Sequence, residues 1–277
     1  MTDSLAIVLP ALREAQNLAG LLPQVHSVAS ALSVPYEVIV VTAAHDRATW
    51  DAAARARARV VLQTAPGYGE ALRSGFAAAS AARVLTMDAD LSHEPRVIAD
   101  LWRERHTADV LIASRYVEGG SAEMPLVRRA LSRILNRVFA RGLSLRVRDL
   151  SSGFRLYDRR LLQPEAYRAR DFDILQEVLV RLYAEGWRIR EVPFRYRPRV
   201  AGSSHARVLA FGLSYARTFW TLWKLRNSIA SADYDDRAFD SPIPLQRYWQ
   251  RKRCSEVLTL VPDKARVLDV YREHMRY

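Results

Sequence analysis

The stretch Val84-Leu85-Thr86-Met87-Asp88-Ala89-Asp90-Leu91-Ser92-His93-Glu94-Pro95 decides how the rest of this chain is interpreted. Its first four residues suit a buried strand, and a helix-start signal follows the two carboxylates directly. The carboxyl ends of parallel strands open onto a ligand crevice, so Asp88 and Asp90 are expected close together at that edge. Two adjacent carboxylates repel each other unless a cation neutralises them, and oxygen ligands of this kind suit Mg²⁺ or Mn²⁺. A solvated turn that caps the next helix is the alternative.

The segments around this stretch alternate between strand and helix patterns. Buried-strand patterns occur at residues 5–10, 36–41, 59–62, 83–87 and 108–113. The segments between them have helical spacing or helix-start signals, and Gly67 and Gly69 open one of these helices. Strands separated by helices of this length predict an α/β fold with a doubly wound, mainly parallel sheet.

The composition favours a globular protein with an anionic partner. The chain has 277 residues, 49% of them hydrophobic, and a formal net charge of +12 that comes almost entirely from arginine. Such a charge points to nucleic acid, a phosphorylated substrate or an acidic membrane surface. The single cysteine, Cys254, excludes an internal disulfide, and no amino-terminal signal peptide is visible. We therefore expect a cytoplasmic protein.

Several motifs together resemble one enzyme family. They are Pro10 with Glu14 and Asn17, and residues 37–41, 67–76, 87–93, 114–116, 149–157 and 199–204. Their order and spacing, from about residue 5 to 227, resemble dolichyl-phosphate mannose synthase and its bacterial polyprenyl-phosphate relatives among the family 2 glycosyltransferases. The resemblance implies a nucleotide-sugar transferase fold of the GT-A type. It also implies metal-dependent, inverting transfer of a sugar from a nucleoside diphosphate donor to a polyprenyl phosphate on the cytoplasmic membrane face.

The resemblance also implies roles for individual residues. In that family the residues matching Asp88 and Asp90 hold the divalent metal and the donor diphosphate, with Ser92 beside them. The residues implied to be catalytic are Asp90, Arg115 and Glu177. Those implied to contact the donor are Pro10, Glu14, Gly69, Asp88 and Ala89. Those implied to hold the acceptor phosphate are Arg115, Arg128, Ser132, Arg199 and His205.

Two positions depart from the family pattern. After the second strand the family usually has two acidic residues that read the nucleoside, where this chain has Thr42-Ala43-Ala44-His45. Asp46 lies close by and is a candidate substitute in donor binding, with an ordinary surface loop as the alternative. His205 stands where a lysine is usual, which predicts weaker and pH-dependent phosphate binding.

The helical pattern at residues 125–141 provides a candidate phosphate cradle. Arg128, Ser132 and Asn136 are spaced i, i+4 and i+8, which places them along one helix face. A guanidinium one turn from a hydroxyl suits a phosphate group. The alternative is a solvated basic face, because Arg129, Arg133 and Arg137 belong to the same segment.

The carboxyl-terminal part is expected to dock on a membrane without crossing it. We assign residues 1–205 to the transferase domain and 206–227 to an amphipathic interfacial helix whose 16-residue apolar run spans roughly 24 Å, less than a hydrocarbon core. Its polar stripe, Ser214, Arg217, Thr221 and Lys224, lies opposite an aromatic-rich face that is expected to contact the membrane. The alternative is that this aromatic face is buried in the domain's own core. Residues 228–246 read as a linker, and residues 247–277 resemble the start of a truncated methyltransferase fold without a cofactor.

Three functions remain compatible with the sequence. The first is the implied transfer to polyprenyl phosphate, with a nucleoside diphosphate sugar and a membrane surface as partners and no nucleic acid. The second is transfer to a hydroxyl of a glycan or another alcohol, in which Glu177 would act as the base. The third is a catalytically impaired binding module at the membrane, because Thr42 and Ala43 replace the donor-reading acidic pair.

Overall fold

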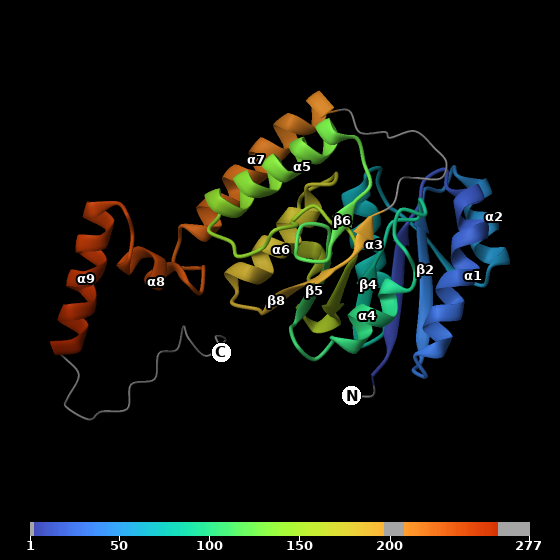
Figure 1. Cartoon of the computed structure of the whole chain (residues 1–277), viewed down its shortest axis with the longest axis horizontal. Helices are drawn as coiled ribbons and strands as arrows, with labels where there is room; N and C mark the ends of the chain where they lie inside the picture. Colours follow the sequence, from blue (N-terminus) through green and yellow to red (C-terminus); the bar gives the residue numbers. More distant parts are fainter. Residues whose placement is uncertain (1–2, 197–207, 260–277) are drawn as a thin grey trace.

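The computed structural model describes residues 3–196 and 208–259, and a seven-stranded sheet lies at its centre (Figure 1). The strands are β1 (Leu5–Pro10), β2 (Tyr36–Thr42), β3 (Arg59–Leu62), β4 (Arg83–Thr86), β5 (Val110–Ser114), β7 (Arg155–Asp158) and β8 (Ile189–Pro193). They follow the order β3-β2-β1-β4-β7-β5-β8, and all neighbours are parallel except those of β7. The predicted α/β fold with a mainly parallel sheet is confirmed.

Strand β1 shows why the sheet is buried on both faces. Its residues alternate between the faces, with Leu5, Ile7 and Leu9 in one apolar cluster and Ala6 and Val8 in the other. On the first face pack helices α1 (Ala15–Ala31), α2 (Arg47–Arg55) and α4 (Val97–Arg103). On the second face pack α3 (Tyr68–Ala78) and α6 (Ile174–Ala184). Helices on both faces explain why the strands read as continuous apolar runs.

Strand β7 has a direction and a place in the sheet that the sequence patterns did not predict. It runs antiparallel between β4 and β5, with Arg155 opposite Thr86 of β4. Because of this direction, the segment before β7 lies at the carboxyl end of β4. Residues 149–154 are therefore brought next to Asp88 and Asp90, although they are some sixty positions away in the sequence.

Helices α5 (Leu126–Gly142) and α7 (Val208–Arg226) lie side by side beyond the sheet (Figure 1). Phe139 of α5 meets Tyr215 and Phe219 of α7 edge to face, with centroid distances of 6.1 and 5.1 Å. Phe219, expected on an interfacial face, instead packs against the domain. Ser214, expected in the exposed polar stripe, donates to Asp173 at 2.7 Å. The expected division of α7 into two faces is therefore wrong at these two residues.

Another part of α7 remains exposed. Trp220 and Trp223 are 54% and 38% exposed, and their rings stack at 5.1 Å. Within the described residues, none of the helices has the length and apolar character required to span a bilayer.

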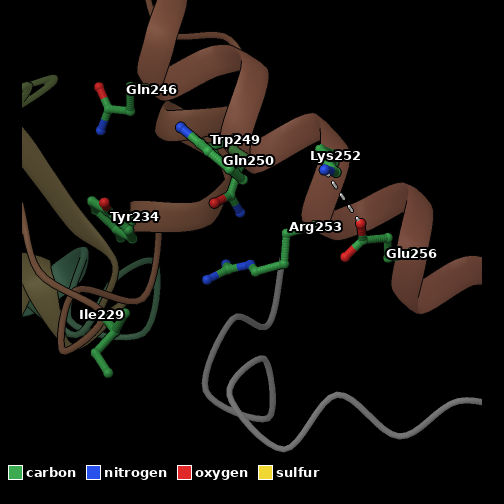
Figure 2. A pocket seen from close by; sticks show the side chains of 8 residues that line it. All are labelled: Ile229, Tyr234, Gln246, Trp249, Gln250, Lys252, Arg253 and Glu256. Atoms are coloured by element: carbon green, nitrogen blue, oxygen red, sulfur yellow. Dashed lines mark ion pairs between the residues drawn. The ribbon is translucent and has the colours of Figure 1, made fainter.

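The segment after α7 is more ordered than a linker. It contains α8 (Tyr234–Phe239), and the guanidinium of Arg226, fully buried, forms a two-point ion pair with Asp233. Helix α9 (Pro244–Thr259) follows, and residues 265–270, where a methyltransferase-like strand was expected, lie outside the described residues. A cavity of about 580 Å³ separates α9 from Ile229 and Tyr234 (Figure 2).

The remaining elements of the described chain are two short strands and two 3-10 turns. The pair β6 (Ser121–Ala122) and β9 (Arg195–Tyr196) forms a separate two-stranded parallel sheet. Two 3-10 turns, Arg159–Leu161 and Pro164–Ala166, lead from β7 towards α6.

Candidate active site

The two carboxylates of the Asp-x-Asp motif follow β4 and differ in exposure. The Asp88 side chain is 27% exposed, whereas Asp90 is buried. Asp90 Oδ1 accepts hydrogen bonds from the backbone N–H of Ser92 at 3.0 Å and from its hydroxyl at 2.5 Å. Ser92 is itself fully buried and orients Asp90 in this structure, and its predicted place in the metal site stays a prediction.

His93 contacts the backbone of Asp88 and lies close to its side chain. Its Nδ1 accepts a hydrogen bond from the backbone N–H of Asp88 at 2.9 Å, which leaves the proton on Nε2, 3.6 Å from Asp88 Oδ2. The ring stacks on Phe154 at 4.9 Å. Burial lowers the pKa of His93 below its ordinary value, although the charges of Asp88 and Asp90 act in the opposite direction. The imidazole is therefore neutral at pH 7 and fixed in one tautomer.

Glycines bring the backbone close to this site. A Cβ on Gly153 would lie 2.8 Å from the Tyr68 hydroxyl and 3.2 Å from Asp88 Oδ1, so only glycine fits without displacing them. Gly69 makes a close packing contact at the start of α3. Its N–H donates to Arg170 O at 2.7 Å, and a Cβ there would clash with Ala169 O, while its predicted donor contact stays a prediction.

Arg115 and Asp149 form a buried ion pair beside the carboxylates. Arg115 Nε and Nη2 donate to the two oxygens of Asp149 at 2.8 and 2.7 Å, with side-chain exposures of 10% and 0%. Burial by itself would raise the pKa of Asp149, but hydrogen bonds and charge from Arg115 hold it below its ordinary value. The pKa of Arg115 is raised because Asp149 outweighs the effect of burial. Asp149 was not singled out in the sequence, since its partner is distant along the chain.

The predicted cradle residues on α5 do converge with Arg115. Arg115 Nη2 also donates to Ser151 Oγ at 2.7 Å, and Asn136 Nδ2 donates to the same oxygen at 3.0 Å. Ser132, one turn earlier on α5, accepts from the Tyr116 hydroxyl at 2.7 Å. We call Arg115, Ser132, Asn136 and Ser151 the polar cluster. Ser151 and Tyr116 were missed, because no local pattern links either to α5.

The remaining predicted acceptor ligands are not part of this cluster. Arg128 lies one turn before Ser132 and is exposed. Arg199 and His205 lie outside the described residues.

Glu177 is occupied by structural contacts. Its Oε2 accepts from the backbone N–H groups of Arg168 and Ala169 at 2.8 and 2.7 Å, and its Oε1 accepts from Arg181. A carboxylate with both oxygens engaged and little exposure is a poor proton acceptor. In this structure Glu177 anchors the segment before α6, and its predicted catalytic role stays a prediction.

Asp46 also has a structural role. Its Oδ1 accepts from Thr49 N at 3.4 Å at the start of α2, and its Oδ2 accepts from Arg13 N at 2.5 Å. These contacts agree with the loop interpretation, and donor binding by Asp46 stays a prediction. Thr42, which replaces the family's first acidic residue, is fully buried, and its hydroxyl finds no partner among the described residues.

The other predicted donor contacts lie at the same edge of the sheet. Pro10 ends β1, and Glu14 Oε2 accepts from Asn17 Nδ2 at 2.5 Å just before α1. Ala89 is buried between the two carboxylates.

The carboxylate oxygens of Asp88 and Asp90 fit a divalent cation that arrives bound to its substrate. Among the described residues there is no group of three or more His, Cys, Asp or Glu side chains able to hold a metal. Asp88 and Asp90 would provide only two side-chain ligands, whereas Mg²⁺ and Mn²⁺ require about six oxygens. Diphosphate oxygens and water would supply the others.

Comparisons with known proteins show the family. The model of "Glycosyl transferase family 2" matches residues 6–164, more than half of the 277 residues. The dolichol-phosphate mannosyltransferase of Pyrococcus furiosus is 28% identical over 81% of this chain, which spans only 65% of that protein's length. The dolichyl-phosphate hexose transferase of Haloferax volcanii is 28% identical over 78% of this chain and 92% of its own.

A solved structure supports the fold. Glucosyl-3-phosphoglycerate synthase from Mycobacterium tuberculosis, in complex with Mn²⁺, UDP and phosphoglyceric acid, superposes with a TM-score of 0.63 at 20% identity. The match covers 81% of this chain and 78% of that one. At this identity the likeness concerns the fold alone.

Proposed function

This chain belongs to glycosyl transferase family 2 and is a glycosyltransferase, and on that premise we propose that it moves a sugar from a nucleoside diphosphate sugar to a polyprenyl phosphate. The observation that carries the proposal is the polar cluster of Arg115, Ser132, Asn136 and Ser151. Ser151 lies only two residues before Gly153, where an added Cβ would lie 3.2 Å from Asp88 Oδ1. A donor site and a phosphate-binding site thus share one short segment.

The chemistry required of the protein is modest. A phosphate acceptor is already anionic at neutral pH, so it attacks without a strong general base. That requirement is consistent with a site in which Glu177 is engaged elsewhere. Asp88 and Asp90 would hold the divalent cation, which supplies charge stabilisation to the departing diphosphate. Arg115, kept charged beside Asp149, and Ser132 would orient the acceptor phosphate.

We also propose where the enzyme meets its lipid acceptor, at a membrane surface that α5 and α7 contact. Helix α5 exposes Leu126, Val127, Leu131, Ile134 and Val138, each more than half exposed, and the neighbouring α7 exposes Trp220 and Trp223. Arg128, Arg133 and Arg137 are exposed on α5 as well, and within the described residues only the carboxyl-terminal part of α5, at Phe139, is shown in contact with α7, at Phe219. Apolar and aromatic side chains interleaved with arginine suit an anionic bilayer surface. We therefore place the enzyme peripherally on the cytoplasmic membrane face, with residues 1–205 as its catalytic domain and α5 joining α7 in docking.

An acceptor assay tests the function. The purified chain is incubated with Mn²⁺, a panel of UDP and GDP sugars, and either polyprenyl phosphate, 3-phosphoglycerate or a soluble oligosaccharide. We expect a product only with polyprenyl phosphate, and we expect Ser132→Ala to raise the acceptor KM about tenfold with the donor KM unchanged. Ser30→Ala, on the exposed side of α1, is the control.

Any other outcome of this assay would indicate a different function. Transfer to the oligosaccharide would replace the proposal with the hydroxyl-acceptor function, and transfer to 3-phosphoglycerate with a soluble phosphorylated acceptor. If no donor is bound or consumed, the chain is a binding module. The replacement of the family's first acidic residue by Thr42 would then be the first cause to test.

Membrane docking makes a separate prediction. The double variant Leu131→Ser with Ile134→Ser should lose tenfold or more affinity for phosphatidylglycerol-containing vesicles, since each exposed side chain contributes about 1.5–3 kcal/mol on burial. Its melting temperature should hardly change, because both residues are 59% exposed. Leu62→Ser, at 40% exposure on the sheet edge, is the matched control. If the parent, the double variant and Leu62→Ser all sediment with vesicles at equal affinity, α5 is not part of the docking surface.

A further inference from the structure

Tyr68 makes a direct contact with the more exposed carboxylate of the site. It is the first residue of α3, and its hydroxyl donates to Asp88 Oδ1 at 3.1 Å. The absence of a side chain at Gly153 leaves room for this bond, because a Cβ there would lie 2.8 Å from the hydroxyl. The other oxygen of Asp88 lies 3.6 Å from His93 Nε2. The two oxygens of Asp88 thus have different neighbours, and this difference fixes the plane of the carboxylate.

The Tyr68 ring is held in place from its other side. Phe172 stacks on it with a centroid distance of 4.3 Å and an interplanar angle of 22°. The next residue, Asp173, is almost fully buried, and its Oδ2 accepts hydrogen bonds from Ser214 and Thr218 of α7, both at 2.7 Å. The position of Phe172 is therefore fixed by α7, and a ring packed in this way has few alternative rotamers.

The hydroxyl of Tyr68 donates its hydrogen bond to Asp88 Oδ1 from a buried position. Burial, followed by the charge of Asp88, raises the pKa of Tyr68 above its ordinary value. A cation ligand needs this kind of neighbour, which orients the carboxylate without competing for the metal.

We propose that Tyr68 is a positioning residue that fixes the Asp88 carboxylate in the orientation in which it binds the donor's divalent cation. This inference rests on the proposed function, because it requires a cation at Asp88. Tyr68 acts through Asp88 and has no part in the bond that breaks. Partners of this kind typically change metal affinity by roughly 10–100-fold when they are removed.

The test measures Mn²⁺ affinity by calorimetry in the presence of UDP or GDP. Tyr68→Phe removes only the hydroxyl and keeps the ring stacked on Phe172. We expect about tenfold weaker Mn²⁺ binding, a higher donor KM, and an unchanged acceptor KM and melting temperature. Tyr36→Phe is the matched control, because its hydroxyl contacts His26 at 3.2 Å, away from the carboxylates. Asp88→Asn reports whether the cation uses Asp88 at all.

The three variants separate the possible failures. If Asp88→Asn loses Mn²⁺ affinity and Tyr68→Phe binds like the parent protein, the positioning role is refuted while the metal site stands. If Asp88→Asn also binds Mn²⁺ like the parent, the metal site of the proposed function fails and the inference fails with it. A fall in melting temperature for Tyr68→Phe with unchanged Mn²⁺ affinity would reduce Tyr68 to a structural residue.

Discussion

Asp90→Asn is expected to reduce sugar transfer by roughly a thousandfold, which is the scale of losing one preorganised electrostatic contact to the transition state. The asparagine keeps the volume and retains an oxygen that accepts from Ser92 N, so the turn after β4 should survive. What disappears is the negative charge that opposes the cation. The melting temperature should therefore stay close to that of the parent.

The measurement is turnover at saturating donor together with a Mn²⁺ titration. Asp100→Asn, which breaks only an exposed pair with Arg103 on α4, is the control and should leave both values unchanged. Parent-like turnover and Mn²⁺ dependence in Asp90→Asn would mean that the Asp-x-Asp motif is a structural turn.

Asp149→Asn is expected to lower the free energy of unfolding by about 3–5 kcal/mol, because it leaves the Arg115 guanidinium buried beside a neutral amide. Both partners are nearly inaccessible to water, so solvent screening does little to reduce this cost. Chemical denaturation at pH 7 measures the change. Asp109→Asn, which disrupts a pair with the half-exposed Arg188, is the matched control and should cost less than about 1 kcal/mol.

The pH dependence gives a second readout for the same pair. The pKa of Asp149 is lower in the folded protein than its ordinary value of 3.8, so the unfolded chain binds the proton first as the pH falls. The contribution of Asp149 to stability is therefore complete above that value and is lost below it. The parent should lose stability more steeply than Asp149→Asn between pH 5 and pH 3. Parallel pH profiles would show that the pair contributes no linkage.

The sequence was sufficient for those features that depend on local pattern. Apolar runs located β1, β2 and β3 to within a residue, because strands covered on both faces are apolar throughout. The Asp-x-Asp motif lies at the carboxyl end of β4 as predicted, and Ser132 and Asn136 share a side of α5 because helical spacing alone sets that relation.

Residue type and spacing did not show which partners several side chains find in the folded protein. Glu177 has the chemistry of a base, but backbone N–H groups of the preceding segment and Arg181 engage its oxygens. Asp46 has the chemistry of a ribose ligand, yet it caps α2. On α7 aromatic residues cover most of the circumference, so periodicity could not tell that Phe219 packs on Phe139 while Trp220 is exposed.

The sequence by itself determined the α/β class, the family and the placement of two carboxylates at one edge of a parallel sheet. Only the tertiary structure decided which groups surround them. Strand β7 inserts antiparallel beside β4, and this insertion brings Asp149, Ser151 and Gly153 to Asp88 and Arg115. Strand pairing between distant segments depends on which buried surfaces fit together, and neither hydrophobic period nor residue type encodes that choice locally.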